Sequence, residues 1–242
     1  MRIVFSRKGF DSSYGGAPSP IVDGVPISLP IPGGNGEQTT FADRGLGDTV
    51  MQLTRGKIAP DAACHDDPMF AEGHCWLGQV GAAQGHLEKQ GVREGDHFLF
   101  FGLFADPETG ERHHRIFGHM HVVAKGSPQG IASHPRWKEP PRPHPHFAGE
   151  WHSSNCIWFG SGATAQRASS ALRLTCEEGP LCRWQVPRWL KRRGLSYHGN
   201  PARWRSGGRL EAVSRGQEFV TDIGKAREPR EWLERVIAEI ES

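Results

Sequence analysis

Two runs rich in aromatic and β-branched residues, His97 to Phe104 and Arg115 to Val123, lie on either side of the turn-like segment Asp106-Pro107-Glu108-Thr109-Gly110. Residues of these types favour strands, and a short Gly- and Pro-containing segment between two such runs is typical of a hairpin. The middle of the chain is therefore predicted to form an antiparallel strand pair, against which the remaining elements pack.

Glycine and proline limit what can surround this hairpin. The 242 residues include 31 Gly and 18 Pro, and hydrophobic residues make up 36%. This composition favours loops and short elements over a helical bundle. The last segment differs, because Arg230 to Glu241 places its apolar residues on one face of an amphipathic helix.

These patterns predict an α+β protein with a mixed or mainly antiparallel sheet and a C-terminal helix packed outside it. A PUA-like barrel core is one form this sheet could take, because Gly91 to Asp96 leads into the first hairpin strand as a Gly-Asp step does in such barrels. Residues 1–242 are expected to form one domain, and a subdomain break near 135–150 stays open because Pro135 to His146 holds five prolines.

The other expected elements are short. Helices are predicted at Asp48 to Arg55, capped by Asp48, and at Gln79 to Gln90. Strands are predicted around Val25 to Ile31, at Asn155 to Phe159, at Ala171 to Thr175, at Arg209 to Ser214 and at Glu218 to Thr221.

No apolar run approaches the length needed to span a bilayer, and Met1 to Phe5 resembles the start of a strand rather than a signal peptide. The protein is expected to be soluble and cytoplasmic. The five cysteines form no Cys-x-x-Cys pair and predict reduced thiols rather than a disulfide scaffold or zinc ribbon.

The net charge of +2 conceals a basic segment. Pro180 to Arg215 contains nine Lys or Arg and one acid, and four aromatic residues are interleaved with them: Trp184, Trp189, Tyr197 and Trp204. Cations that neutralise phosphate and rings that stack on bases together suit nucleic-acid binding, with Arg215 among the cations. The alternative is a solvated basic face above core tryptophans.

The loop from Ser6 to Pro20 crowds cations, hydroxyls and glycines after a short apolar strand. Arg7 and Lys8 are candidates to bind phosphate, since glycines let a backbone approach a ligand closely. The segment lacks the Gly-Lys-Ser/Thr order of a Walker loop, and a tight polar turn is the alternative.

Two groups of residues could carry chemistry. His65, Asp66, Asp67, His74 and Cys75 are of the types that ligate Zn²⁺ or Fe²⁺, with turn capping by the two aspartates as the alternative. Leu195 to Pro201 forms a sharp turn in which His198 could act as acid or base or simply hydrogen-bond within the turn. A cation and a carboxylate, Arg215 and Glu218, follow at a strand start.

Four segments taken in order resemble one family: Phe5 to Pro20, Gly81 to Val92, Leu195 to Pro201 and Gly216 to Val220. The chain looks like the nucleotide modification associated domain 3 family, whose members are described as enzymatic domains linked to DNA base hypermodification with the reaction unassigned. The resemblance implies functional roles for residues that match its motif positions, namely Arg7, Lys8, Asp11, His65, Asp67, Gln84, His86, Tyr197, His198, Arg215, Gln217 and Glu218. It does not support Cys64 or Asp66 as ligands.

The resulting hypothesis is an enzyme that modifies nucleotides or DNA bases. Its expected catalytic residues are Asp11, His65, Asp67, His86, His198 and Glu218, and Arg7, Lys8, Trp184, Trp189, Tyr197, Trp204 and Arg215 are expected to bind phosphate or bases. The cofactor is unknown; a divalent metal on His65 and Asp67 is one option. The alternative is a non-catalytic PUA-like module that binds modified bases. Expected partners are DNA or a nucleotide and other DNA-modification proteins, with no membrane.

Overall fold

The computed structural model describes residues 1–34, 36–106, 108–177 and 179–242. Pro107 of the predicted hairpin turn lies outside the described residues, as do Asn35 and Glu178. The strands are β1 (Arg2–Arg7), β2 (Ser19–Val22), β3 (Val25–Pro26), β4 (Ile31–Pro32), β5 (Cys64–His65), β6 (Met69–Ala71), β7 (His74–Gln79), β8 (His97–Ala105), β9 (Arg112–Gly126), β10 (Cys156–Thr164), β11 (Arg183–Gln185), β12 (Trp204–Arg205), β13 (Arg209–Glu211) and β14 (Glu218–Asp222). The helices are α1 (Gly47–Leu53), α2 (Gly81–Lys89), α3 (Pro128–Ile131), α4 (Arg188–Arg193) and α5 (Arg227–Ile240), with 3₁₀ turns η1 (Pro145–Phe147), η2 (Ser170–Leu172) and η3 (Pro201–Arg203).

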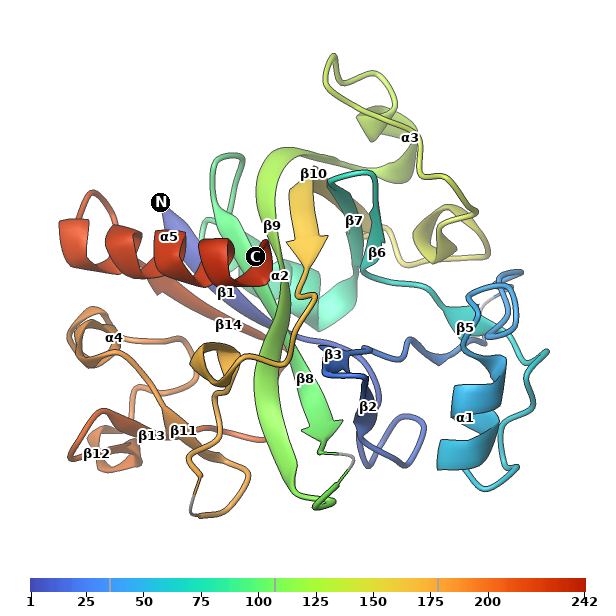
Figure 1. The fold of residues 1–242 in the computed structure, drawn as a ribbon. Coiled ribbons are helices and arrows are strands. Elements are labelled where there is room, and N and C mark those ends of the chain that lie inside the picture. The colour runs from blue at the N-terminus through green and yellow to red at the C-terminus, as the bar shows by residue number, and fades with distance from the viewer. Residues whose placement is uncertain (35, 107, 178) are drawn as a thin grey trace.

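One large sheet occupies the centre of the molecule (Figure 1). It has nine strands among the described residues, in the order β14-β1-β8-β9-β10-β7-β6, with β2 joined to β8 and β3 to β2. The pairing is mainly antiparallel, but β1 and β2 run parallel to β8. The predicted α+β class with a mixed, mainly antiparallel sheet is confirmed.

The predicted hairpin forms two neighbouring strands in the middle of this sheet. β8 and β9 pair from His97 opposite His121 to Ala105 opposite Arg112. β9 is 15 residues long and pairs along its other side with β10, so it links the two halves of the sheet. The expected strand pair is confirmed.

The sheet is open. Its path ends at β14 on one side and β6 on the other, and no described strand joins these two edges. Closure into a barrel would require such a pairing. The β14 edge instead packs against α2 and α4, so the expectation of a PUA-like barrel is wrong.

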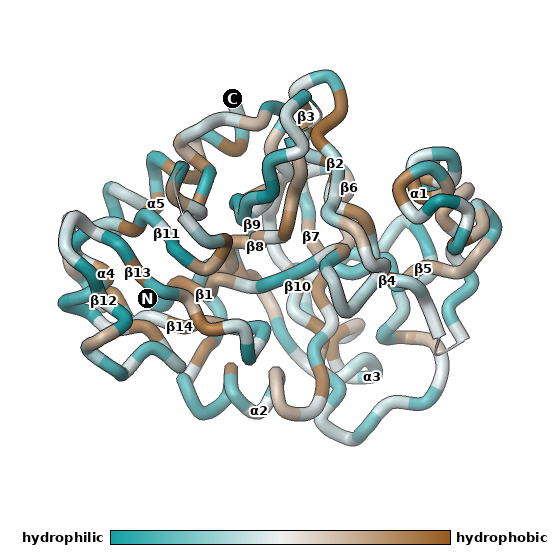
Figure 2. Tube along the Cα trace, turned by 90° about the horizontal axis from the view of Figure 1, so that it is seen from below, coloured by the Kyte–Doolittle hydropathy of each residue, from teal (hydrophilic) through white to brown (hydrophobic). Residues whose placement is uncertain are grey.

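Both faces of the sheet are buried, because alternate side chains of a strand point to opposite sides. Ile3 and Phe5 of β1 join a core cluster with residues of α4 and α5, whereas Val4 joins a second cluster that includes Leu87 of α2. α5 alternates between hydrophilic and hydrophobic residues along its length (Figure 2), and its apolar side is buried. The C-terminal amphipathic helix is confirmed.

The smaller elements follow the predictions with two differences. The expected helices correspond to α1 and α2, but Asp48 does not cap α1, whose N-cap is Leu46. The strand expected at Ala171 to Thr175 is wrong, because the chain turns there through η2, capped by the Ser169 side chain, and makes only isolated bridges. The strands expected near residues 25–31, 155–159, 209–214 and 218–221 are present as β3 and β4, β10, β13 and β14. Within the described ranges, no helix is long and apolar enough to cross a membrane.

Candidate metal centre

The candidate site lies where the connection from β5 to β6 meets η1 and the ends of β1 and β7. β5 pairs with β4, which sets Ile31 opposite His65. The backbone N–H of Asp67 donates to the carbonyl of His65 at 2.8 Å, and this turn brings both side chains to one side. His146 belongs to η1, where Pro145 has the fixed φ that suits a first helical position. Segments from the N-terminal strand, from residues 64–79 and from η1 therefore meet at one place.

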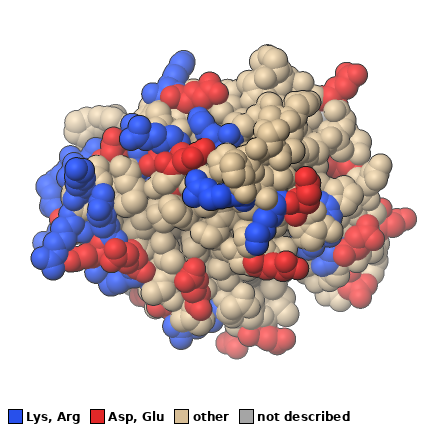
Figure 3. Space-filling model, turned by 90° about the horizontal axis from the view of Figure 1, so that it is seen from above, with Lys and Arg blue, Asp and Glu red and all other residues tan. Residues whose placement is uncertain are grey.

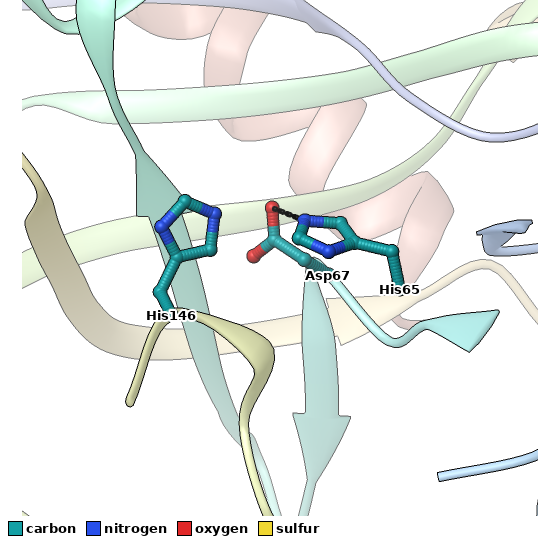
Figure 4. A group of neighbouring side chains, drawn as sticks. All are labelled: His65, Asp67 and His146. Atoms are coloured by element: carbon teal, nitrogen blue, oxygen red, sulfur yellow. Dashed lines mark ion pairs between the residues drawn. The ribbon is translucent and has the colours of Figure 1, made fainter. Parts of the chain in front are cut away.

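His65, Asp67 and His146 form a group that could hold a metal ion. One ligand atom from each of these residues lies within 4.8 Å of those of the others. The carboxylate of Asp67 lies between the two imidazole rings (Figure 4), with His65 Nε2 3.9 Å from Asp67 Oδ2. Two imidazoles and one carboxylate that leave further positions open form the ligand set of non-haem iron centres, and the same donors bind zinc.

Outer partners orient both imidazoles. Nδ1 of His65 lies 2.9 Å from Glu37 Oε1, and Nδ1 of His146 lies 2.7 Å from Asn155 Oδ1. Each oxygen accepts the Nδ1 proton, so Nε2 keeps its lone pair, which is how metal-binding histidines are usually held. These contacts fix the orientation of both rings and leave Nε2 available to a shared ion.

A close approach of backbone and ring makes one glycine necessary. A Cβ placed on Gly78 would lie 2.1 Å from ring atoms of His146, far inside van der Waals contact. The backbone N–H of the same residue donates to Asp67 Oδ1 at 2.7 Å. Gly78 in β7 therefore supports two of the three candidate ligands.

The protonation states also suit metal binding. Burial alone would raise the pKa of Asp67, but the contact with His144, whose Nε2 lies 3.3 Å from Asp67 Oδ1, and the charge of Lys8 outweigh it and hold that pKa well below its usual range. Burial lowers the pKa of His146 to about 4 despite the nearby Asp67 charge. At neutral pH the group thus offers a carboxylate and a neutral imidazole.

Lys8, whose side chain is 10% exposed, and the buried Glu218 lie beside the candidate ligands. Lys8 Nζ is 3.9 Å from Asp67 Oδ2 and 3.7 Å from Glu218 Oε1. Glu218 also accepts hydrogen bonds from Ser6 Oγ at 3.0 Å and Gln79 Nε2 at 2.5 Å. Burial raises the pKa of Glu218, although Lys8 opposes this shift.

The candidate ligands and Lys8 face a cavity of about 520 Å³, a size common for sites that bind small molecules. Lys8, His65, Asp67 and His146 line it, and two aromatic rings, Tyr14 and Trp151, belong to the same wall. Tyr14 is half exposed, and Trp151 stacks on His146 with ring centroids 4.2 Å apart. An adjoining cavity of about 760 Å³ shares Lys8 with this wall.

The other predicted residues of the N-terminal loop have mixed positions. Both terminal nitrogens of Arg7 donate to backbone carbonyls, at 2.7 Å to Ser214 and 3.1 Å to Val213. Asp11 lines the cavity, but its Oδ1 accepts from the N–H groups of Ser13 and Tyr14 in a local turn. Arg7 and Asp11 therefore hold loops around the cavity.

The predicted residues around His198 form a separate group. His198 is 1% exposed, and both ring nitrogens are occupied, because Nδ1 donates to the Ser196 carbonyl and Nε2 accepts from the Val213 N–H. His86 Nε2 lies 2.9 Å from Ser196 Oγ, and its ring stacks on Tyr197. The structure brings these residues together with one another and not with the candidate ligands.

The tryptophans expected to stack on bases lie mostly inside the protein. Trp184 is 1% exposed and Trp189 is 2% exposed, both in the core beneath α5, while Trp204 donates from Nε1 to the His198 carbonyl. The cations of this segment lie outside: Lys and Arg gather at the end of the molecule where α4 and α5 lie (Figure 3). Arg215 is exposed and lines the adjoining cavity.

The sequence patterns assigned no site role to His146, Trp151, Glu37 or Asn155. His146 belongs to a proline-rich stretch, where regular periodicity gives no signal. The pattern His144-Pro145-His146 was the usable clue, since proline fixes the turn that carries the second histidine. Nothing local in the sequence marks the other three.

The fold and the site define an α+β protein with a candidate centre of two histidines and one carboxylate. The sequence profile of the nucleotide modification associated domain 3 family matches residues 2–222, so the chain belongs to this family. The family description associates the chain with nucleotide modification. Comparison with curated proteins and with solved structures gave no match.

Proposed function

We propose that this protein is a metal-dependent enzyme that modifies a nucleotide or a base in DNA. The observation that carries the proposal is the convergence of His65, Asp67 and His146, each with an outer partner, on one cavity. A bound Zn²⁺ or Fe²⁺ would supply Lewis-acid or redox chemistry at this place.

The charges around the cavity support a cation there. Asp67 and Glu218 place two carboxylates beside the single ammonium of Lys8, which lies 3.9 Å from the first and 3.7 Å from the second. Packing acidic groups together without a counter-charge is unfavourable. A divalent ion on the candidate ligands would offset this excess.

The rings in the cavity wall support a planar substrate. Tyr14 and Trp151 offer aromatic faces beside the candidate ligands, and aromatic rings stack on bases of any sequence. In this proposal Tyr14 and Trp151 stack on the base in place of Trp184 and Trp189, whose rings are buried in the core. The expected partners are therefore a nucleotide or DNA that presents an unstacked base.

Isothermal titration of the chelator-treated protein with Zn²⁺, and with Fe²⁺ under anaerobic conditions, tests the centre. We expect one ion per chain in the wild type and a loss of affinity of at least about 100-fold in His65→Ala and Asp67→Asn. His74→Gln is the matched control, because this nearby histidine stacks on Phe159 and bonds the Glu72 carbonyl instead.

Mass spectrometry of nucleosides from treated DNA and of free nucleotides tests the chemistry. A mass change that requires the metal and disappears in His65→Ala supports the enzyme. Metal binding without any mass change, together with selective retention of modified DNA, would support the module that binds modified bases.

A further inference from the structure

Lys8 lies beside the candidate metal ligands without being one of them. Its backbone N–H donates to the Phe101 carbonyl at 2.9 Å, which extends the pairing of β1 with β8 by one residue. Its side chain is only 10% exposed, yet it lines both the site cavity and the adjoining one. A lysine so placed loses much of its hydration and contributes little to the packing of the sheet.

Glu218 fixes the position of this ammonium group. The glutamate is fully buried and does not line the cavity; Ser6 Oγ and Gln79 Nε2 hold its Oε1, which lies 3.7 Å from Lys8 Nζ. Buried ion pairs of this kind often stabilise a fold no better than apolar residues of similar size. The pair is therefore better explained by a function at the cavity.

The ammonium retains the capacity to bind a further group. Its distances to Asp67 Oδ2 and Glu218 Oε1 are both longer than a hydrogen bond, and an ammonium has three donors. His65 Nε2 also lies 3.9 Å from the same carboxylate oxygen, Oδ2 of Asp67. An ion held by His65 and Asp67 would therefore lie close to Lys8, because Lys8 and His65 both approach the same oxygen, Oδ2.

We propose that Lys8 and the metal together bind an oxyanion, a carboxylate or phosphoryl group of the substrate or a co-substrate. The inference rests on the proposed metal centre. Two positive centres that face one cavity attract a negatively charged oxygen more strongly than either does alone, and low exposure reduces screening by water. Lys8 is then a substrate-binding residue of the centre.

Cobalt substitution of the full-length protein provides the test, since Co²⁺ gives a visible spectrum that responds to new ligands. Inorganic phosphate and acetate are titrated in separate arms into the Co²⁺ protein. We expect one of them to change the spectrum of the wild type, and a weakening of that anion by at least tenfold in Lys8→Gln. Lys8→Arg keeps the charge and should recover part of the affinity.

Each outcome separates the two proposals. A wild type that binds no Co²⁺ overturns the metal centre and the Lys8 site together. Co²⁺ binding with no response to either anion, or with equal anion affinity in the wild type and Lys8→Gln, overturns the Lys8 site alone. Lys125→Met is the control, because Lys125 lies over the Trp158 ring at 4.8 Å and outside both cavities, and it should leave the affinity unchanged. The arm that responds identifies the anion as phosphoryl or carboxylate.

Discussion

Two regions of the molecule carry residues that suggest chemistry, and the structure uses them in opposite ways. In the basic segment from residue 180 to 215, the aromatic rings of Trp184 and Trp189 are buried and the cations are mostly exposed. Around the candidate centre, the charged side chains of Lys8 and Asp67 are only 10% and 4% exposed, and the rings of Tyr14 and Trp151 lie in the cavity wall. The first arrangement is what folding alone requires, whereas burial of charge beside a cavity is what a functional site requires.

This difference shows that suggestive residues grouped in one stretch of sequence are weaker evidence for a functional site than residues from distant stretches that the fold brings together. The basic segment is conspicuous because its residues are neighbours in sequence. The candidate centre draws on residues 8, 65, 67, 78, 146 and 218, which no short stretch of the sequence contains.

The largest effect should come from the buried tryptophan. Trp184→Ala is expected to lower the free energy of unfolding by about 3–5 kcal/mol, because it removes a ring packed on Phe101 at 4.9 Å between centroids. Trp151→Ala, which removes a partly buried ring, should cost less than about 2 kcal/mol but weaken substrate binding. Urea unfolding compares the two variants, and equal losses would contradict the distinction between a core ring and a cavity ring.

A second test changes the centre without touching a ligand. Gly78→Ala places a methyl group where the His146 ring lies, so the ring has to move. Metal affinity is expected to fall by at least about 100-fold, as for loss of a ligand, while circular dichroism shows a folded protein. Gly85→Ala is the matched control, since a Cβ there meets open space. Unchanged metal affinity in Gly78→Ala would exclude His146 as a ligand.

A smaller effect is expected from the outer partner of the same histidine. Asn155→Ala removes the oxygen that accepts the Nδ1 proton of His146 at 2.7 Å. Loss of such a partner typically lowers metal affinity by about 10- to 100-fold, less than loss of the ligand itself. Calorimetric titration with Zn²⁺ measures the change, and an effect as large as that of His146→Ala would show that Asn155 does more than orient the ring.

The sequence predicted elements better than their assembly. The hairpin of β8 and β9 and the helix α5 follow from local patterns, and both are present. The barrel was wrong because closure depends on the edges of the sheet, which no local pattern describes. Of the candidate centre, His65 and Asp67 could be predicted because they share one turn. His146 could not be joined to them, because 78 residues separate it from Asp67 and no local pattern shows that η1 approaches Gly78.

The smallest effect concerns pH and His114, which lies beside the buried Trp184. Trp184 Nε1 can only donate, and it lies 3.2 Å from His114 Nδ1, which also lies 3.3 Å from the Leu181 carbonyl; the bond from Trp184 forms only while this nitrogen carries no proton. Burial, together with the charge of Arg7, lowers the pKa of His114 to about 4. The unfolded chain, with an ordinary pKa of about 6.5, binds this proton between pH 6.5 and 4 while the folded protein does not.

Stability therefore rises with pH across this window, and His114 contributes at most about 1.4 kcal/mol per pH unit to the slope. Above pH 6.5 the residue has no further effect, because it is neutral in both states. Urea unfolding at pH 4.5, 5.5, 6.5 and 7.5 gives the free energy of unfolding against pH. Below pH 6.5 this free energy should rise less steeply in His114→Gln than in the wild type, by up to about 1.4 kcal/mol per pH unit. A variant with the wild-type slope would mean that His114 takes up its proton equally in the folded and the unfolded chain, so that the bond from Trp184 does not keep the ring neutral.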